Sequence, residues 1–254
     1  MADISLISSL ASFVYFVSLT SVYFFLKFFS KTSKMVMIWT IVYFLILIVS
    51  QFFINTSIST NLCGTPQYVT ILIVTIIPWV IMLGTIKMLL TVFPGWLSPF
   101  SNTFGYIITK IFGINDILNS ILVENFDKKE QSDDVKIAAK ALEHIYTDKS
   151  LLINEITQEN FNTFWTRMSK AGLFKDNITD ELKEKLRSMV ILKDTVSEYI
   201  WYILTGGLVT SVSYNYMVNS ECVKSVKELE KNVAEAQDNI TTAADNKEEI
   251  VYKS

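Results

Sequence analysis

Few side chains in this chain of 254 residues have the type and spacing that covalent chemistry needs. A nucleophilic serine or cysteine requires a general base, and the sequence has one histidine, His144, beside Glu143 in a stretch with helical periodicity. A solvated or partly buried surface histidine is the more ordinary role. The sequence has no HExxH, no CxxC and no glycine-rich phosphate loop. We therefore expect a protein that is not an enzyme and that has no metal and no cofactor.

The two cysteines, Cys63 and Cys222, are too few for a zinc cluster or a disulfide scaffold. Each lies a few residues from the end of a predicted membrane span, on the same side of the membrane in the orientation derived below. A lumenal compartment permits disulfides. We predict that the two cysteines pair. The alternative is two unrelated free thiols, because the same depth in a membrane does not imply proximity within its plane.

Lys87 is the one charged residue inside the third predicted span. An ionisable residue within a membrane is by default a functional candidate. A simpler explanation is that its aliphatic stem lets the ammonium group reach the membrane surface, which lies within two helical turns. No aspartate, glutamate or histidine accompanies Lys87 in the predicted spans. A proton relay or an ion pathway therefore has no visible parts.

The elements that position these residues are predominantly apolar helices. Half of the residues are hydrophobic and 19% are charged, whereas soluble domains carry about 25% charged residues. The shortage of charge is concentrated in the first hundred residues and again near residue 200, which indicates an integral membrane protein. The net charge of −3 leaves no footprint for nucleic acid.

Four stretches are long and apolar enough to cross a bilayer, for which roughly 20 residues suffice. Pro78 should kink the third of them. Gly206 and Gly207 lie in the middle of the fourth, where they allow close approach of another helix or a weak bend. The predicted spans are residues 4–26, 35–54, 68–92 and 199–218.

The orientation follows from the distribution of lysines in the short loops. Lys27, Lys31 and Lys34 surround the first loop, whereas the second loop, residues 55–67, carries no charge. Basic loops face the cytosol. The N-terminus and the charged C-terminal tail are then lumenal, and residues 94–198 are cytosolic.

The cytosolic part is predicted to be a small helical domain over residues 107–198. Its first helix, interrupted at Gly113, is interpreted as a core helix, with an amphipathic helix lying on the membrane as the alternative. A capping pattern at Thr157 starts a further helix, and Asn177 or Thr179 caps the last. The last helix has no interruption before the fourth span.

The tail after the fourth span, residues 219–254, is charged. It begins with a short heptad pattern of about two and a half repeats and ends in a stretch with the composition of a disordered segment. A short helix packed on a neighbour is expected there rather than an autonomous coiled coil. The helical domain of residues 107–198 contains one further predicted helix, at residues 135–146.

Residues 93–106, called the collar here, separate the membrane part from the soluble part. Prolines and a glycine interrupt the helix, and aromatic side chains of this kind lie at headgroup depth. The collar could be a connecting loop, a membrane anchor, or a docking site for a partner or for the chain's own helical domain. Its candidate interface residues are Pro94, Gly95, Trp96, Pro99, Phe100, Phe104 and Tyr106.

This collar resembles a segment of membrane-associated proteins of nucleocytoplasmic large DNA viruses. The resemblance covers about a dozen residues at useful specificity, and the rest of the chain only in its general plan. It implies a structural protein, such as a minor capsid protein, in a virion inner membrane derived from a host endomembrane. It also implies contacts with capsid or other structural proteins.

We therefore expect an all-α, polytopic membrane protein that anchors a protein assembly to a membrane. Its expected contacts are the lipid bilayer, structural proteins and further copies of the chain. The alternative function is a small membrane transporter or a channel subunit.

Overall fold

The computed structural model describes residues 2–30, 32–123, 148–175, 178–220, 222 and 237, with side chains from residue 10 onward. Regular structure in this part of the chain is helical, apart from one isolated antiparallel bridge between Leu122 and Phe174. The prediction of an all-α fold is confirmed for these residues. The predicted helix at 135–146, His144 and the rest of the tail lie outside the described residues.

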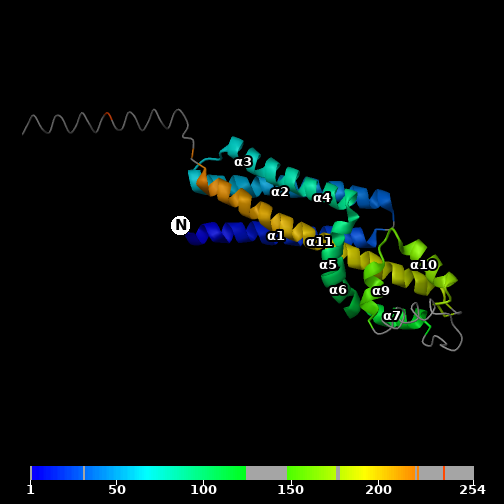
Figure 1. Ribbon diagram of the computed structural model, residues 1–254. Coiled ribbons are helices and arrows are strands. Elements are labelled where there is room, and N and C mark those ends of the chain that lie inside the picture. Colours follow the sequence, from blue (N-terminus) through cyan, green and yellow to red (C-terminus); the bar gives the residue numbers. More distant parts are fainter. Residues whose placement is uncertain are drawn as a thin grey trace, which may run out of the picture.

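Three helical segments in the described part are long and apolar enough to cross a membrane. Figure 1 shows them side by side, together with the second half of a longer helix, α11. The first two are α1 (Ala2–Phe29) and α2 (Ser33–Cys63). The third comprises α3 (Tyr68–Thr75), η1 (Ile76–Met82) and α4 (Leu83–Val92).

Pro78 changes the winding of the third segment. The chain adopts a π-helix over η1, which contains Pro78 and the buried Trp79. Proline has no backbone N–H, so a regular α-helix would lose one hydrogen bond there and its ring would clash with the preceding turn. A wider turn is one of the usual ways in which a helix accommodates such an interruption.

The loop predicted after the second span is wrong for residues 55–63, because α2 continues nine residues beyond residue 54. Polar residues of this stretch, which predicted a loop, form hydrogen bonds with the next helical segment and with the residue that precedes it. Asn55 Nδ2 donates to Thr75 Oγ1 at 2.9 Å, and the backbone N–H of Gln67 donates to Ser59 Oγ at 2.9 Å. The helix ends where Gly64 adopts the left-handed conformation that glycine accepts without strain.

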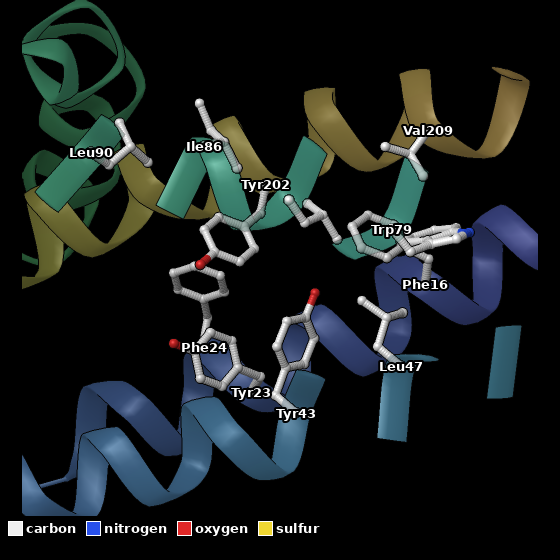
Figure 2. Packing of buried hydrophobic residues seen from close by; sticks show 11 residues of the cluster. Phe16, Tyr23, Phe24, Tyr43, Leu47, Trp79, Ile86, Leu90, Tyr202 and Val209 are labelled. Carbon is white, nitrogen blue, oxygen red and sulfur yellow. The ribbon is translucent and has the colours of Figure 1, made fainter. Parts of the chain in front are cut away.

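Helix α11 (Asp180–Asn219) is one continuous helix of 40 residues. Thr179 caps its N-terminus by accepting a hydrogen bond from the backbone N–H of Leu182. Its second half packs among the apolar helices, where buried side chains from all of them form one cluster (Figure 2). Its composition does not place it with the three segments named above, so a fourth span at 199–218 stays a prediction.

The close approach of α1 and α11 depends on Gly206. A Cβ atom added there would lie 2.1 Å from ring atoms of Phe16, which is fully buried. At Gly207 the nearest atom, Phe13 Cε2, would be 3.4 Å away. Gly206 is thus the point of contact, and Gly207 has room.

Replacing Gly206 by alanine is expected to lower the free energy of unfolding by about 1–3 kcal/mol, because the buried ring of Phe16 has to move. Gly207→Ala is the matched control and should change stability much less. Urea unfolding in detergent, followed by circular dichroism, measures both variants. Equal destabilisation by the two substitutions would contradict this account of the helix contact.

A second cluster of buried side chains lies beyond the end of the apolar bundle. It joins α7 (Ile114–Ile121), α9 (Lys149–Glu155), α10 (Phe161–Lys170) and the first half of α11. Gly113, with a φ of 87°, forms the interruption predicted before α7. Figure 1 shows these shorter helices at one end of the bundle, with α11 passing from them into it.

The capping pattern predicted at Thr157 is present, but it lies a few residues before the first residue of α10. The side chains of Thr157 and Asn160 each accept a hydrogen bond from the other's backbone N–H. The helix itself begins at Phe161 and not directly after Thr157. The reciprocal pair therefore forms a turn that precedes the helix.

A disulfide joins Cys63, at the end of α2, to Cys222, three residues beyond α11, with their Cα atoms 5.4 Å apart. Of the two alternatives that the sequence left open, the structure contains the bridge. It links two helix ends at the end of the bundle opposite the second cluster (Figure 1).

We expect no free thiol in the denatured, unreduced protein, because both cysteines of the chain are in this bridge. Thiol labelling with a maleimide, read by mass spectrometry, makes the measurement. A reduced and denatured sample is the positive control and should take up two labels. Full labelling without reduction would exclude the bridge.

Candidate functional site

The collar crosses the end of the bundle as a series of short helical turns. After α4 ends at Val92, η2 (Pro94–Leu97), α5 (Ser98–Phe100), the π-helix η3 (Ser101–Gly105) and α6 (Tyr106–Ile111) follow. The helix interruption that was predicted from the prolines is thus limited to one residue, Phe93, between α4 and η2. Each proline occupies the first turn of a new helix, where its missing N–H is not needed.

Three hydrogen bonds fix the collar to α11. Ser197 Oγ donates to the carbonyl oxygen of Leu97 at 2.6 Å, and Trp201 Nε1 donates to the carbonyl oxygen of Trp96 at 2.9 Å. Ser101 Oγ donates to Asp194 Oδ1 at 2.8 Å. The donors and acceptors are 93 to 105 residues apart in sequence.

Aromatic rings add to this contact. The ring of Phe100 meets the ring of Trp201 edge-on, with centroids 5.0 Å apart. The ring centroid of Trp96 lies 6.4 Å from that of Trp201. Tyr106 packs against the second cluster. Trp96 and Phe104 remain 45% and 53% exposed. The collar therefore docks on this chain's own long helix and still presents aromatic surface outward.

Gly105 is the closest point of this crossing. A Cβ atom there would lie 2.5 Å from the carbonyl oxygen of Lys193. The Lys193 side chain is almost fully buried, and its ammonium group donates to the carbonyl oxygens of Ile153 and Ile156 at 2.7 and 3.0 Å. Burial lowers the pKa of Lys193 below its ordinary value, although the neighbouring carboxylate of Asp194 opposes the change. Lys193 thus ties the end of α9 to α11.

A buried cluster of charges lies next to the collar. Glu198 accepts hydrogen bonds from Lys27 of α1 and from Lys87 of α4, the latter at 2.9 Å. The side chains of Glu198, Lys27 and Lys87 are 11%, 17% and 32% exposed. Burial of this kind makes an ion pair costly unless each charge keeps its partner.

The sequence favoured an ammonium group of Lys87 that reaches the membrane surface, and the structure adds that this group pairs with Glu198. Nothing in the local pattern reveals this pairing, because Glu198 lies 111 residues further along the chain. The one feature of the sequence that could have indicated the pairing is the position of Glu198, an acidic residue directly before the fourth predicted span.

A polar cavity of about 280 Å³ lies between the collar, the chain after α9, and α11. Its wall includes Asp194 and Asn154, whose buried Oδ1 has no hydrogen-bond partner. Burial raises the pKa of the Asp194 carboxyl above its ordinary range, and the hydrogen bond from Ser101 opposes this. The cavity is large enough for several water molecules.

Polar side chains also connect the helices inside the bundle. Each bond joins two different helices, as polar residues do between helices in lipid. The pairs are Ser12 with Gln51 at 3.1 Å, Thr20 with Tyr43 at 3.0 Å, Tyr23 with Thr40 at 2.9 Å, and Ser213 with the Val74 carbonyl at 3.0 Å.

The described residues contain no group of three or more histidine, cysteine, aspartate or glutamate side chains that could hold a metal ion. The structure defines an all-helical protein with three segments that could span a membrane. Comparisons with protein-family models, with curated proteins and with solved structures found no match for this chain. The interpretation of the site therefore rests on its own geometry.

Proposed function

We propose that this chain is a structural integral membrane protein that anchors a protein assembly to a membrane. The observation that carries the proposal is the fixed junction between the collar and α11. Three hydrogen bonds, a buried charge cluster and a glycine contact join α4 and the collar to α11, the helix common to both clusters. Such a junction fixes the polar end of the molecule to the apolar bundle, as an anchor requires.

The membrane assignment draws on the outer surface of the bundle. Large apolar side chains there are more than half exposed, which is unfavourable in water and ordinary in lipid. With the basic first loop in the cytosol, residues 94–198 are cytosolic and the second half of α11 forms a fourth span. Examples of the exposed side chains are Leu45, Phe53, Val69 and Met88.

The identity of the assembly is the finer part of the proposal. The collar, residues 93–106, carries the resemblance to membrane proteins of large DNA viruses, and it is also the segment that docks on α11. A viral capsid, with this chain in the virion inner membrane as a minor capsid protein, is the assembly that this resemblance favours. Other structural proteins and further copies of the chain are the expected contacts.

Replacing Trp96 and Phe100 together by alanine tests the anchor. We expect normal membrane insertion, and loss of at least 10-fold in the amount of assembly recovered with the membrane, because interface aromatics contribute about 2 kcal/mol or more each. Sedimentation of membranes, followed by quantitative mass spectrometry of the bound assembly, measures both quantities. Phe53→Ala, on the outer face of α2, is the control.

Unchanged recovery with normal insertion would leave the collar without a role in attachment. Electron tomography of the source membranes gives an independent measurement, since a structural protein should form an ordered array. Scattered single copies would contradict the proposal.

A transporter or channel subunit is the second candidate. The observation that favours it is the set of buried hydroxyl and amide groups between the helices, such as Gln51 with Ser12 and Tyr43 with Thr20. Most of these groups are paired, as in ordinary helix packing. Ion flux in reconstituted liposomes separates the candidates, because the structural protein should add no flux to that of protein-free liposomes.

A further inference from the structure

The segment from η3 to α6 presents two different faces. Ser101, Gly105 and Thr109 recur every four residues and are buried. Phe104, Ile107 and Ile111 lie on the opposite side and are 53%, 53% and 73% exposed. Phe112, directly after α6, is 63% exposed. The chain therefore keeps a row of large apolar side chains uncovered.

The direction of this row follows from its neighbours. Asn102 lines the polar cavity and Tyr106 packs on the second cluster, so the side of the segment that carries them faces the short helices. Gly105 contacts α11 at Lys193, and Phe100 contacts it at Trp201. Trp201 lies two helical turns beyond Lys193, toward the apolar half of α11. The exposed row shares the side of Phe100 and therefore faces the bundle end.

The orientation of the segment agrees with this. Figure 1 shows α5 and α6 running across the end of the bundle, at a steep angle to its long helices. A helix placed so lies along the surface of any bilayer that surrounds the bundle. Lys110, exposed at the edge of the row, has the aliphatic stem and charged end that suit such a surface.

We propose that Phe104, Ile107 and Ile111 insert into the boundary between headgroups and acyl chains of the same bilayer that the bundle crosses. Interfacial helices bind lipid through such an apolar face. This rests on the proposed membrane location. It assigns a lipid contact to the segment from η3 to α6, which begins in the collar and continues beyond it. It also sets the distance of the second cluster from the membrane.

Spin labels on single introduced cysteines test the proposal in phosphatidylcholine vesicles. Cys63 and Cys222 are joined to each other, so a label attaches to the introduced thiol alone. Ile107→Cys and Ile111→Cys place labels on the row. Ser120→Cys, exposed on α7, is the aqueous control, and Leu45→Cys, exposed on α2, is the lipid control.

Labels at 107 and 111 are expected to collide more with oxygen than with a water-soluble nickel complex, as at 45, whereas the label at 120 should show the reverse. Nickel-dominated collisions at 107 and 111, with a lipid-like label at 45, would overturn the proposal and leave the membrane location standing. Protection of these labels from both reagents would indicate contact with protein and would also overturn it. A water-exposed label at 45 would remove the membrane location itself.

Discussion

Replacing Glu198 by glutamine is expected to lower the free energy of unfolding by about 3–5 kcal/mol, the largest effect of any single change considered for this chain. Glutamine keeps the size of the side chain and removes its charge. The ammonium groups of Lys27 and Lys87, which are mostly buried, then lose the carboxylate that both contact. Chemical denaturation in detergent, followed by circular dichroism, measures the change.

Two further variants make this result specific to the buried cluster. Glu181→Gln removes an exposed partner of Lys185 on the same helix and should change the stability little, because water screens this pair. Combining Glu198→Gln with Lys27→Met removes one of the unpaired cations and should recover part of the loss. A small effect of Glu198→Gln, comparable to that of Glu181→Gln, would show that water reaches the cluster and screens its charges.

Replacing Gly105 by alanine is expected to cost about 3 kcal/mol, near the upper end for an added methyl group. The new Cβ would meet the carbonyl oxygen of Lys193 at 2.5 Å and its Cγ at 2.9 Å. A backbone atom within a long helix cannot turn away as a side chain can, so the collar has to separate from α11. The same denaturation measurement gives the stability change.

Gly84→Ala is the matched control, because that glycine lies in α4 with no atom within 4 Å of its added Cβ. Alanine there should stabilise the helix by about 0.5–1 kcal/mol. Opposite signs for the two substitutions are therefore expected. Destabilisation by both would point to a general intolerance of the fold and against the contact between Gly105 and Lys193.

Local features were predictable because they depend on neighbouring residues. The three apolar segments and the interruption at Gly113 follow from composition and glycine conformation, and the start of α11 is at Thr179, one of the two caps that the sequence offered. Each of these depends on interactions within one or two helical turns. The continuous run of α11 was predictable for the same reason, since no proline or glycine interrupts it before Gly206.

Partners at long range were not predictable. The sequence left open whether the aromatic collar was a connecting loop, a membrane anchor, or a docking site for a partner or for this chain. Trp201 and Ser197, which hold the collar, carry no local signal because they lie about a hundred residues further on. For the same reason α2 was predicted too short, since Asn55 reads as a loop residue until its partner Thr75 is known.

By itself the sequence therefore determined the long apolar helices, and it located their ends to within a few residues except at the C-terminal end of α2, where the error is nine residues. The tertiary structure alone decided which charges neutralise each other, which glycines carry a helix contact and onto what the collar folds. The physical reason is the range of the forces: hydrogen bonding within a helix is local, whereas the burial of Glu198 or Gly105 depends on helices brought together from distant parts of the chain.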